Sequence, residues 1–294
     1  MAKPKKKRLD DILIERGLFQ TRDEAMRAVL AHEVKVGTEF AQSPAARYGS
    51  DCPIEVRSKL PYVSRGGLKL AGALDAFHQN VKGLHCIDVG SSTGGFTDCL
   101  LQAEAASVAA VDVNYGQLAW KLREDPRVRV YERTNIRTTD LSQLEGPFDL
   151  IVADLSFISL AMLTPVFAKL SYNRLNKTAE AATQDYFRRL ENCPDNKSTI
   201  QEIDEMSHAR VLEFISNSSL DSTIFIGLIK PQFESNHDET DRGVVRDDVV
   251  KARVVEEVRQ ALRDAGFGQD EVVASPLIGP AGNEEFLVRS IYLG

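Results

Sequence analysis

The sequence lacks a long apolar run. No stretch of about 18 apolar residues occurs among its 294 residues, so we predict no membrane-spanning helix. Residues 1–8 hold five Lys/Arg with no apolar segment behind them, which argues against a secretory signal peptide. We therefore expect a globular protein of the cytoplasm without a membrane partner.

Cysteine and histidine are sparse. The four cysteines, Cys52, Cys86, Cys99 and Cys193, lie far apart and form no C-x-x-C pair, and the five histidines do not cluster. Disulfide frameworks and zinc sites depend on such groupings. We expect reduced, mostly buried cysteines and no metal ion.

Positive charge is concentrated near the N-terminus, although the net charge of −7 taken alone argues against nucleic acid. Residues 1–70 hold 14 Lys/Arg against 9 Asp/Glu, and the rest of the chain holds 22 against 34. Such a region is suited to phosphates, with a solvated basic tail as the alternative. The candidate RNA-binding residues are Arg8, Arg16, Arg22, Arg27, Lys35 and Arg65.

The pattern of residues 1–60 predicts a small α+β domain. Apolar residues recur at helical spacing over 8–13 and 21–30, and Thr21 with Glu24 forms a capping box. Residues 34–37 and 54–56 alternate like strands. A linker and the first helix of a second domain follow over 61–82.

From residue 83 to residue 294 the pattern is typical of an α/β domain, with a parallel sheet and helices on both faces. We predict strands at 85–89, 108–113, 128–131, 148–154, 223–229, 271–275 and 286–292. We predict helices near 66–78, 95–104, 116–124, 159–169 and 247–265.

Residues 171–221 interrupt this alternation, because two to six residues usually connect a helix to a strand. The segment is polar, with helical spacing around 178–191 and 199–216. We interpret it as an inserted helical hairpin joined at 192–196, with disorder as the alternative. We expect it outside the catalytic crevice, since it enters the fifth strand at its amino end.

A glycine-rich segment follows the first predicted strand, where small residues let the backbone approach a ligand at a helix start. Asp112 ends the next strand, 22 residues after Gly90, where a carboxylate can accept both ribose hydroxyls of an adenosine. Ser92 replaces the second glycine of the dehydrogenase pattern G-x-G-x-x-G, which argues against an oxidoreductase. The candidate cofactor-binding residues here are Asp88, Gly90, Ser91, Ser92, Thr93, Gly94, Gly95 and Phe96.

Two further charged residues end predicted strands. Asp154 ends the fourth strand, and Lys230 closes the apolar run at 224–229. Such strand ends border the ligand crevice of open α/β sheets, so we expect both residues beside the cofactor pocket. A solvated ion pair without a function is the alternative.

Five motifs together resemble the TlyA (hemolysin A) family: residues 62–70, 88–98, 132–137, 154–159 and 229–234. The resemblance covers nearly the whole chain except the insertion. It implies an N-terminal alpha-L RNA-binding motif followed by an FtsJ-like methyltransferase domain with a Rossmann-like class I sheet.

The resemblance also implies site residues and a cofactor, S-adenosyl-L-methionine. A catalytic tetrad of Lys, Asp, Lys and Glu maps onto Lys69, Asp154, Lys230 and Glu285, with the adjacent Glu284 as an alternative to the last. Asn135 would lie near the adenine, and Asp112 on the ribose.

The reaction implied by the resemblance is methylation of ribosomal RNA at a ribose 2′-hydroxyl, with cytidine as the modified nucleotide. The implied partners are ribosomal RNA or ribosomal subunits. Lys230 would accept the hydroxyl proton or stabilise the developing alkoxide with Lys69 beside it, while Asp154 and Glu285 orient the amines. The alternatives are a membrane-active cytolysin, a noncatalytic RNA-binding assembly factor and a pseudouridine synthase. The sequence has no long apolar segment that would favour a cytolysin. A pseudouridine synthase would not need the glycine-rich loop.

Overall fold

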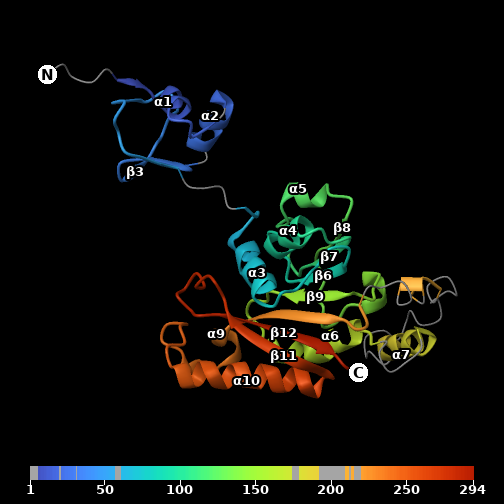
Figure 1. Ribbon diagram of the computed structural model, residues 1–294. Helices are drawn as coiled ribbons and strands as arrows, with labels where there is room; N and C mark the ends of the chain where they lie inside the picture. Colours follow the sequence, from blue (N-terminus) through green and yellow to red (C-terminus); the bar gives the residue numbers. More distant parts are fainter. Residues whose placement is uncertain are drawn as a thin grey trace. The chain divides into compact units, whose positions relative to one another are not determined.

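The structure is a computed structural model that describes residues 6–19, 21–30, 32–56, 61–173, 179–191, 209–211, 213–214 and 220–294. The chain divides into two compact units, Met1–Leu60 and Pro61–Gly294, which are described separately (Figure 1).

The first unit contains two helices and short strands. The helices are α1 (Leu9–Glu15) and α2 (Arg22–Leu30), and the strands are β1 (Lys7–Arg8), β2 (Val34–Val36), β3 (Glu39–Phe40), β4 (Arg47–Tyr48) and β5 (Ile54–Val56). Strands β3, β2 and β5 form one sheet in that order, and β1 pairs with β4. Leu9, Leu13, Val29 and Val34 are fully buried in the core between helices and sheet. The two predicted helices and both predicted strand segments are present.

The second unit contains a seven-stranded sheet in the order β11-β12-β10-β9-β6-β7-β8. The strands are β6 (His85–Val89), β7 (Ser107–Val111), β8 (Val128–Tyr131), β9 (Leu150–Ala153), β10 (Ile224–Ile229), β11 (Phe267–Ala274) and β12 (Phe286–Tyr292). Strand β12 runs antiparallel to both neighbours, while β10, β9, β6, β7 and β8 are mutually parallel. The predicted α/β class and all seven strands are confirmed.

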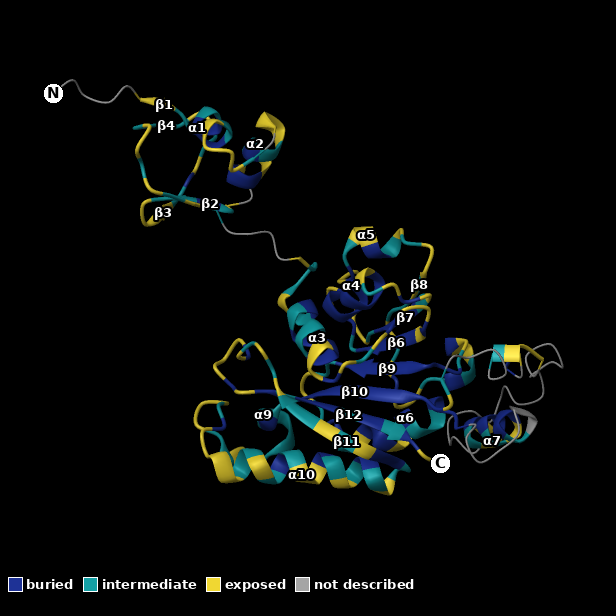
Figure 2. Cartoon of the chain, in the orientation of Figure 1, coloured by how far each residue is buried: buried dark blue, intermediate teal, exposed yellow. Residues whose placement is uncertain are grey.

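Helices cover both faces of this sheet. They are α3 (Arg65–Ala76), α4 (Gly95–Gln102), α5 (Trp120–Arg123), α6 (Thr164–Leu170), α7 (Ala179–Glu191), α9 (Pro231–Glu234) and α10 (Asp248–Asp264), with short 3₁₀ turns at Leu141–Leu144, Ala161–Leu163 and His237–Glu239. One core joins the sheet to α6, α7 and α10, and the other joins it to α3, α4 and α5. Strands β9 and β10 are buried throughout, as Figure 2 shows. Their continuous apolar sequence is explained by this coverage on both faces.

Several predicted boundaries were wrong, including the start of α6 at Thr164 rather than near residue 159. Strand β11 begins at Phe267 rather than 271, because Phe267 pairs with Tyr292 of β12. Strand β9 is limited to Leu150–Ala153 within the predicted 148–154. The helix predicted over 116–124 is α5 alone, since Gly116 has a φ of +75° and lies in a turn.

The insertion is packed into the core where the structure describes it. Helix α7 matches the helix predicted over 178–191, and Ala182, Tyr186 and Leu190 are buried. The guanidinium of Arg189 donates to the carbonyl of Ser171 at 2.6 Å. The predicted hairpin joint and most of the second predicted helix lie outside the described residues, as does Cys193.

Cys86 and Cys99 are buried and Cys52 is half-buried, all three as free thiols. Among the helices that the structure describes, none has the length and apolar character needed to cross a membrane.

Candidate active site

The four predicted tetrad residues form two lysine–carboxylate pairs in the second unit. Lys230 follows β10 and Asp154 follows the neighbouring parallel strand β9, and the Lys230 Nζ lies 2.7 Å from the Asp154 Oδ1. The Lys69 ammonium, on α3, pairs with the Glu285 carboxylate just before β12. The side chains of Lys69 and Glu285 are only 9% and 1% exposed. All four predicted tetrad residues are therefore engaged in ion pairs.

The two pairs belong to one region. Gly66 lies one helical turn before Lys69, and a Cβ atom on Gly66 would stand 3.8 Å from the Asp154 Oδ2. A Cβ atom on Gly90 would stand 2.6 Å from the Asp154 carbonyl oxygen. The start of α3, the glycine-rich loop and the Asp154 carboxylate thus meet at the carboxyl edge of the sheet.

The two adjacent glutamates, Glu284 and Glu285, lie in different environments. Glu284 is exposed and pairs with Lys251 of α10 at 3.0 Å. Glu285 is buried against Lys69. Because consecutive residues entering a strand point to opposite sides, only Glu285 faces the tetrad.

The loop that carries Glu285 depends on a residue that sequence reasoning missed. Asn283 is 1% exposed; its Oδ1 accepts the Val245 N–H and its Nδ2 donates to the Gly243 carbonyl, both at 2.9 Å. A Cβ atom on Gly279 would stand 2.6 Å from the Glu285 Oε1, so only glycine leaves room for that carboxylate. The Gly-x-x-Gly-Asn sequence before Glu284 was the available signal.

A cavity of about 530 Å³ opens beside these residues. Gly90, Ser92, Asp112 and Asn135 all line it, together with apolar side chains that include Ile136. The Asp112 Oδ2 accepts the Ser92 N–H at 2.8 Å, which joins the end of β7 to the glycine-rich loop. Four of the predicted cofactor-binding residues thus share one cavity.

The other predicted loop residues do not line this cavity. Asp88 is fully buried and accepts hydrogen bonds from the Thr97 N–H at 2.9 Å and the Thr97 Oγ1 at 2.6 Å, and burial raises the pKa of Asp88 to about 7. Gly94 has a φ of +93° and lies against Leu118, where a Cβ atom would clash. These residues shape the loop rather than contact the space beside it. The remaining members of the set outside the cavity are Ser91, Thr93, Gly95 and Phe96.

Phe157 is a second residue that sequence reasoning did not single out. It is 90% exposed, has a φ of +64°, and its ring lies 5.1 Å from that of Phe233. An exposed aromatic side chain on strained backbone is a signal of function that a sequence does not display. Ser156, its neighbour, lies with its Oγ 3.1 Å from the Lys230 Nζ. Glu234 holds the same loop, accepting from the Ser159 hydroxyl at 2.7 Å.

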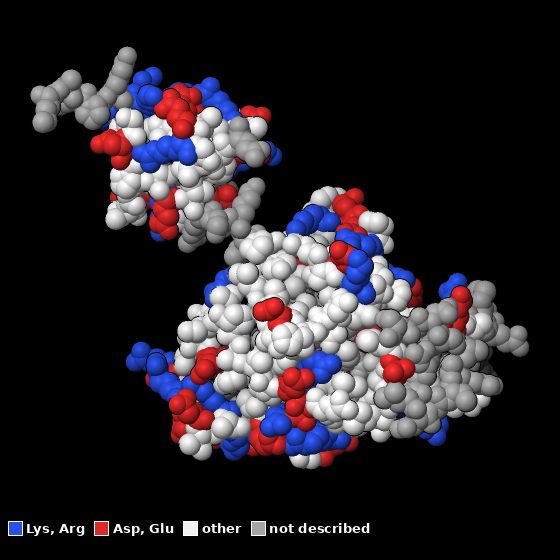
Figure 3. Space-filling model, viewed as in Figure 1, with Lys and Arg blue, Asp and Glu red and all other residues white. Residues whose placement is uncertain are grey.

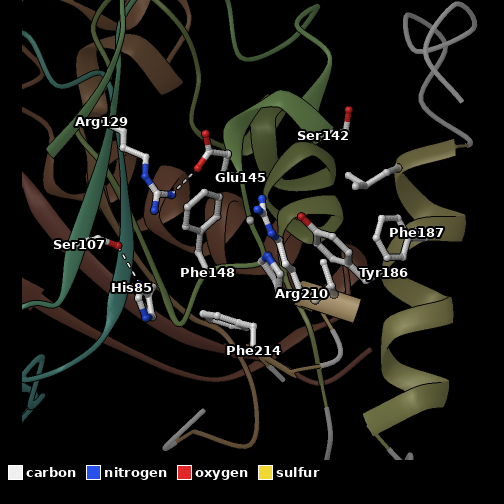
Figure 4. Close-up of a pocket in the computed structure, with 14 residues that line it drawn as sticks. His85, Ser107, Arg129, Ser142, Glu145, Phe148, Tyr186, Phe187, Arg210 and Phe214 are labelled. Atoms are coloured by element: carbon white, nitrogen blue, oxygen red, sulfur yellow. Dashed lines mark hydrogen bonds and ion pairs between the residues drawn. The ribbon is translucent and has the colours of Figure 1, made fainter. Parts of the chain in front are cut away.

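A second cavity, of about 460 Å³, lies at the opposite edge of the sheet (Figure 4). His85 and Ser107, the first residues of β6 and β7, line it and are hydrogen bonded to each other at 2.8 Å. Tyr186 of the insertion forms another wall. None of the predicted catalytic or cofactor-binding residues lines this cavity, so the insertion helix lies at the amino edge, away from the tetrad.

In the first unit, two predicted RNA-binding arginines share a buried partner. Arg8 and Arg22 both pair with Asp10, at 2.7 and 3.2 Å, and Arg22 also pairs with Asp11 at 2.9 Å. Hydrogen bonds from Arg8 hold the pKa of Asp10 well below its ordinary value. Positive and negative side chains alternate on the surface of this unit, as Figure 3 shows. The basic excess is therefore partly neutralised locally.

The other predicted RNA-binding residues have weaker internal contacts. Arg16 donates to the Ser50 carbonyl at 2.7 Å, and Arg27 donates to the carbonyl of Asp23 at 3.3 Å. Lys35 lies 3.9 Å from Glu55 and 5.2 Å from the Phe40 ring centre. The last of the set, Arg65, belongs to the second unit and donates to the Ile278 carbonyl at 2.9 Å.

The sheet order and the cavity at its carboxyl edge define a Rossmann-like domain. Residues 62–292 match the family model of FtsJ-like methyltransferases. The chain is 37% identical to the 16S/23S rRNA (cytidine-2′-O)-methyltransferase TlyA of Mycobacterium tuberculosis, over 96% of this chain and 88% of that protein. It is 31% identical to hemolysin A of Brachyspira hyodysenteriae, over 97% and 99%.

A solved structure from Streptococcus thermophilus, provisionally assigned as a hemolysin, superposes with a TM-score of 0.63 at 32% identity, over 99% of this chain and 90% of that one. The chain belongs to the TlyA (hemolysin A) family of FtsJ-like methyltransferases.

Proposed function

We propose that the protein transfers a methyl group from S-adenosyl-L-methionine to the 2′-hydroxyl of a cytidine in ribosomal RNA. The observation that carries the proposal is that two lysine–carboxylate pairs, one buried and one half-buried, lie beside a cavity at one edge of the sheet. The ribosomal substrate is supported by the name of the Mycobacterium tuberculosis relative.

The cavity suits the proposed cofactor. Its volume of about 530 Å³ lies in the range of small-molecule sites. Asp112 directly follows β7 and presents a carboxylate that retains acceptor capacity beyond its bonds to two backbone N–H groups, which suits ribose hydroxyls. Asn135 and Ile136 offer an amide and an apolar surface for an adenine. Bound there, S-adenosyl-L-methionine would supply an electrophilic methyl group.

The tetrad residues then act on the ribose hydroxyl. Methyl transfer is an in-line displacement, so the main task of the protein is to align the attacking oxygen. Lys230 is held by Asp154, and its ammonium group is placed to hydrogen bond the 2′-oxygen as charge develops or, in its neutral form, to take the proton. The Lys69–Glu285 pair adds a second positive charge whose position is fixed by burial.

Recognition of RNA is divided between the units in this proposal. The basic first unit, residues 1–60, supplies affinity for phosphates, and the second unit, residues 61–294, whose first helix carries Lys69, supplies chemistry. Phe157, exposed beside Phe233, offers a face on which a nucleobase can stack.

The proposal is tested by incubating the protein with methyl-labelled S-adenosyl-L-methionine and ribosomal RNA, then digesting the RNA to nucleosides. Label is expected in 2′-O-methylcytidine. The Lys230→Ala variant should lose turnover by about a hundredfold or more if general-base magnitudes apply, with cofactor affinity retained. Lys251→Ala is the matched control, because that lysine pairs with Glu284 outside the tetrad.

Three results would contradict the proposal. Label recovered on a base rather than a ribose would exclude the 2′-hydroxyl. Cofactor binding without transfer to any RNA would favour the noncatalytic assembly factor. Full turnover in Lys230→Ala would require a different catalytic group.

A further inference from the structure

Helix α5 is a firmly anchored surface element near the proposed cofactor cavity. Leu118 and Leu122 are 4% and 2% exposed and pack against Gly94 of the glycine-rich loop. The N–H of Ala119 donates to the Thr93 carbonyl at 3.2 Å. The backbone of α5 is therefore held against the glycine-rich loop that borders the cavity.

Trp120 lies on the outer face of α5. It is the only tryptophan of the chain and is 74% exposed. Two other apolar side chains of the same connection are also exposed, Tyr115 by 68% and Val113 by 61%. Val113 also lines the cavity. Val113, Tyr115 and Trp120, three exposed apolar residues within eight positions of the chain, are called the exposed strip. A tryptophan side chain contributes most to binding energy when a partner buries its large ring. Exposed apolar patches commonly mark interaction sites.

Cationic groups border this strip. The guanidinium of Arg133 lies 4.5 Å from the ring centre of Tyr115. The Lys121 Nζ lies 2.9 Å from the Asp98 carboxylate but its side chain remains 57% exposed, and Figure 3 shows basic side chains next to acidic ones over α5. Aromatic surface beside cations matches single-stranded RNA, in which bases alternate with phosphates.

The strip also adjoins the point where the chain enters the second unit. The same Asp98 that pairs with Lys121 accepts the Val63 N–H at 2.8 Å. Lys121 and Val63, near the start of the second unit, thus share one carboxylate.

We propose that Trp120 stacks on an unpaired base of the substrate RNA that flanks the target nucleotide. The inference rests on the proposed function, because it takes RNA as the substrate. Stacking on α5 is a docking contact outside the chemistry, so Trp120 sets RNA affinity and leaves the reacting groups untouched. Since every base has an aromatic face, the contact tolerates changes of sequence in the flanking nucleotide.

The test measures binding of deproteinised ribosomal RNA and of a short oligocytidylate to the full chain. Trp120→Ala should weaken RNA binding by roughly 5- to 150-fold, the equivalent of losing one stacked base, while Trp120→Phe keeps most of the affinity. The KM for RNA should rise in Trp120→Ala, whereas kcat at saturating RNA and the affinity for S-adenosyl-L-methionine stay unchanged. Val249→Ala, at a residue 76% exposed on α10, is the matched control and should bind RNA normally.

The single tryptophan gives a direct second measurement. Its fluorescence should be quenched on addition of the oligocytidylate to the wild-type chain. Unchanged RNA affinity in Trp120→Ala would overturn the inference, as would an effect confined to intact ribosomal subunits, which would assign the surface to a protein partner. If wild-type protein binds RNA through Trp120 but transfers no methyl group, the proposed function fails and the docking contact stands.

Discussion

The two edges of the sheet differ in how their charged side chains are paired. At the carboxyl edge, Lys69 and Glu285 form a pair with side chains 9% and 1% exposed. At the amino edge, Arg129 and Glu145 form a pair with side chains 46% and 62% exposed. A buried pair pays a large desolvation cost that often exceeds its attraction, whereas a surface pair is nearly neutral. The buried Lys69–Glu285 pair is therefore expected to contribute little to stability, which agrees with its part in the proposed reaction.

The largest expected effect concerns the most deeply buried carboxyl group of the carboxyl edge, that of Asp88. Burial raises the pKa of Asp88 to about 7 from 3.8, so the folded state holds its proton more tightly than the unfolded chain. The free energy of unfolding should therefore fall as pH rises from about 4 to about 7, by about 4 kcal/mol at 1.36 kcal/mol per pKa unit.

Asp88→Asn removes the titrating group, so its stability relative to wild type should increase across that interval and become constant above it. Urea unfolding at several pH values measures both curves. Parallel curves would show that Asp88 does not titrate in this range. Burial at the carboxyl edge would then have no measurable effect on the pKa of Asp88 or on the pH dependence of stability.

The second prediction compares the adjacent glutamates. Glu285→Gln should lower the rate of methyl transfer by about a hundredfold or more, because the charge that holds Lys69 is lost from a buried position. Glu284→Gln should leave the rate unchanged, since Glu284 contacts Lys251 on the surface. Single-turnover rates at saturating RNA and cofactor provide the measurement. Equal losses in both variants would mean that the burial of Glu285 has no catalytic significance.

Topology explains why part of this edge could be predicted from the sequence. Asp154 and Lys230 each follow an apolar strand, and parallel strands deliver their carboxyl ends to one edge, so strand patterns alone brought the two together. Glu285 precedes the antiparallel strand β12 and reaches the edge through a loop. The spacing of apolar residues does not predict that Glu285 lies at this edge, and only the family resemblance indicated its position.

The direction in which loop residues face was not predictable. Cofactor contact stays a prediction for the whole glycine-rich loop, but within it Gly94 packs on Leu118 and Asp88 accepts a hydrogen bond from Thr97. Motif membership does not distinguish a residue that lines a cavity from one that supports the loop. Phe157 was missed for a related reason, since its positive φ and exposure arise from tertiary context.

The third prediction concerns the cavity at the carboxyl edge. Asp112→Ala should weaken binding of S-adenosyl-L-methionine by about tenfold or more, because a charged acceptor for ribose hydroxyls is lost together with the bond that fixes Ser92. Isothermal titration calorimetry provides the measurement, with Ser107→Ala in the amino-edge cavity as control. If Ser107→Ala weakens cofactor binding as much as Asp112→Ala does, the cofactor has been assigned to the wrong edge.

The smallest effect is expected for the exposed pair of the amino edge. The Arg129 Nη1 lies 2.9 Å from the Glu145 Oε2, and both side chains are largely in solvent, where screening and side-chain entropy offset most of the attraction. A double-mutant cycle with Arg129→Gln and Glu145→Gln should give a coupling energy below about 1 kcal/mol in the free energy of unfolding. The rate of methyl transfer should remain that of the wild type in all three variants, because the pair lies at the opposite edge from Lys230. A large loss of rate in Arg129→Gln with stability intact would show that the amino edge takes part in the reaction. Burial of an ion pair would then not distinguish pairs that act in the reaction from pairs that do not.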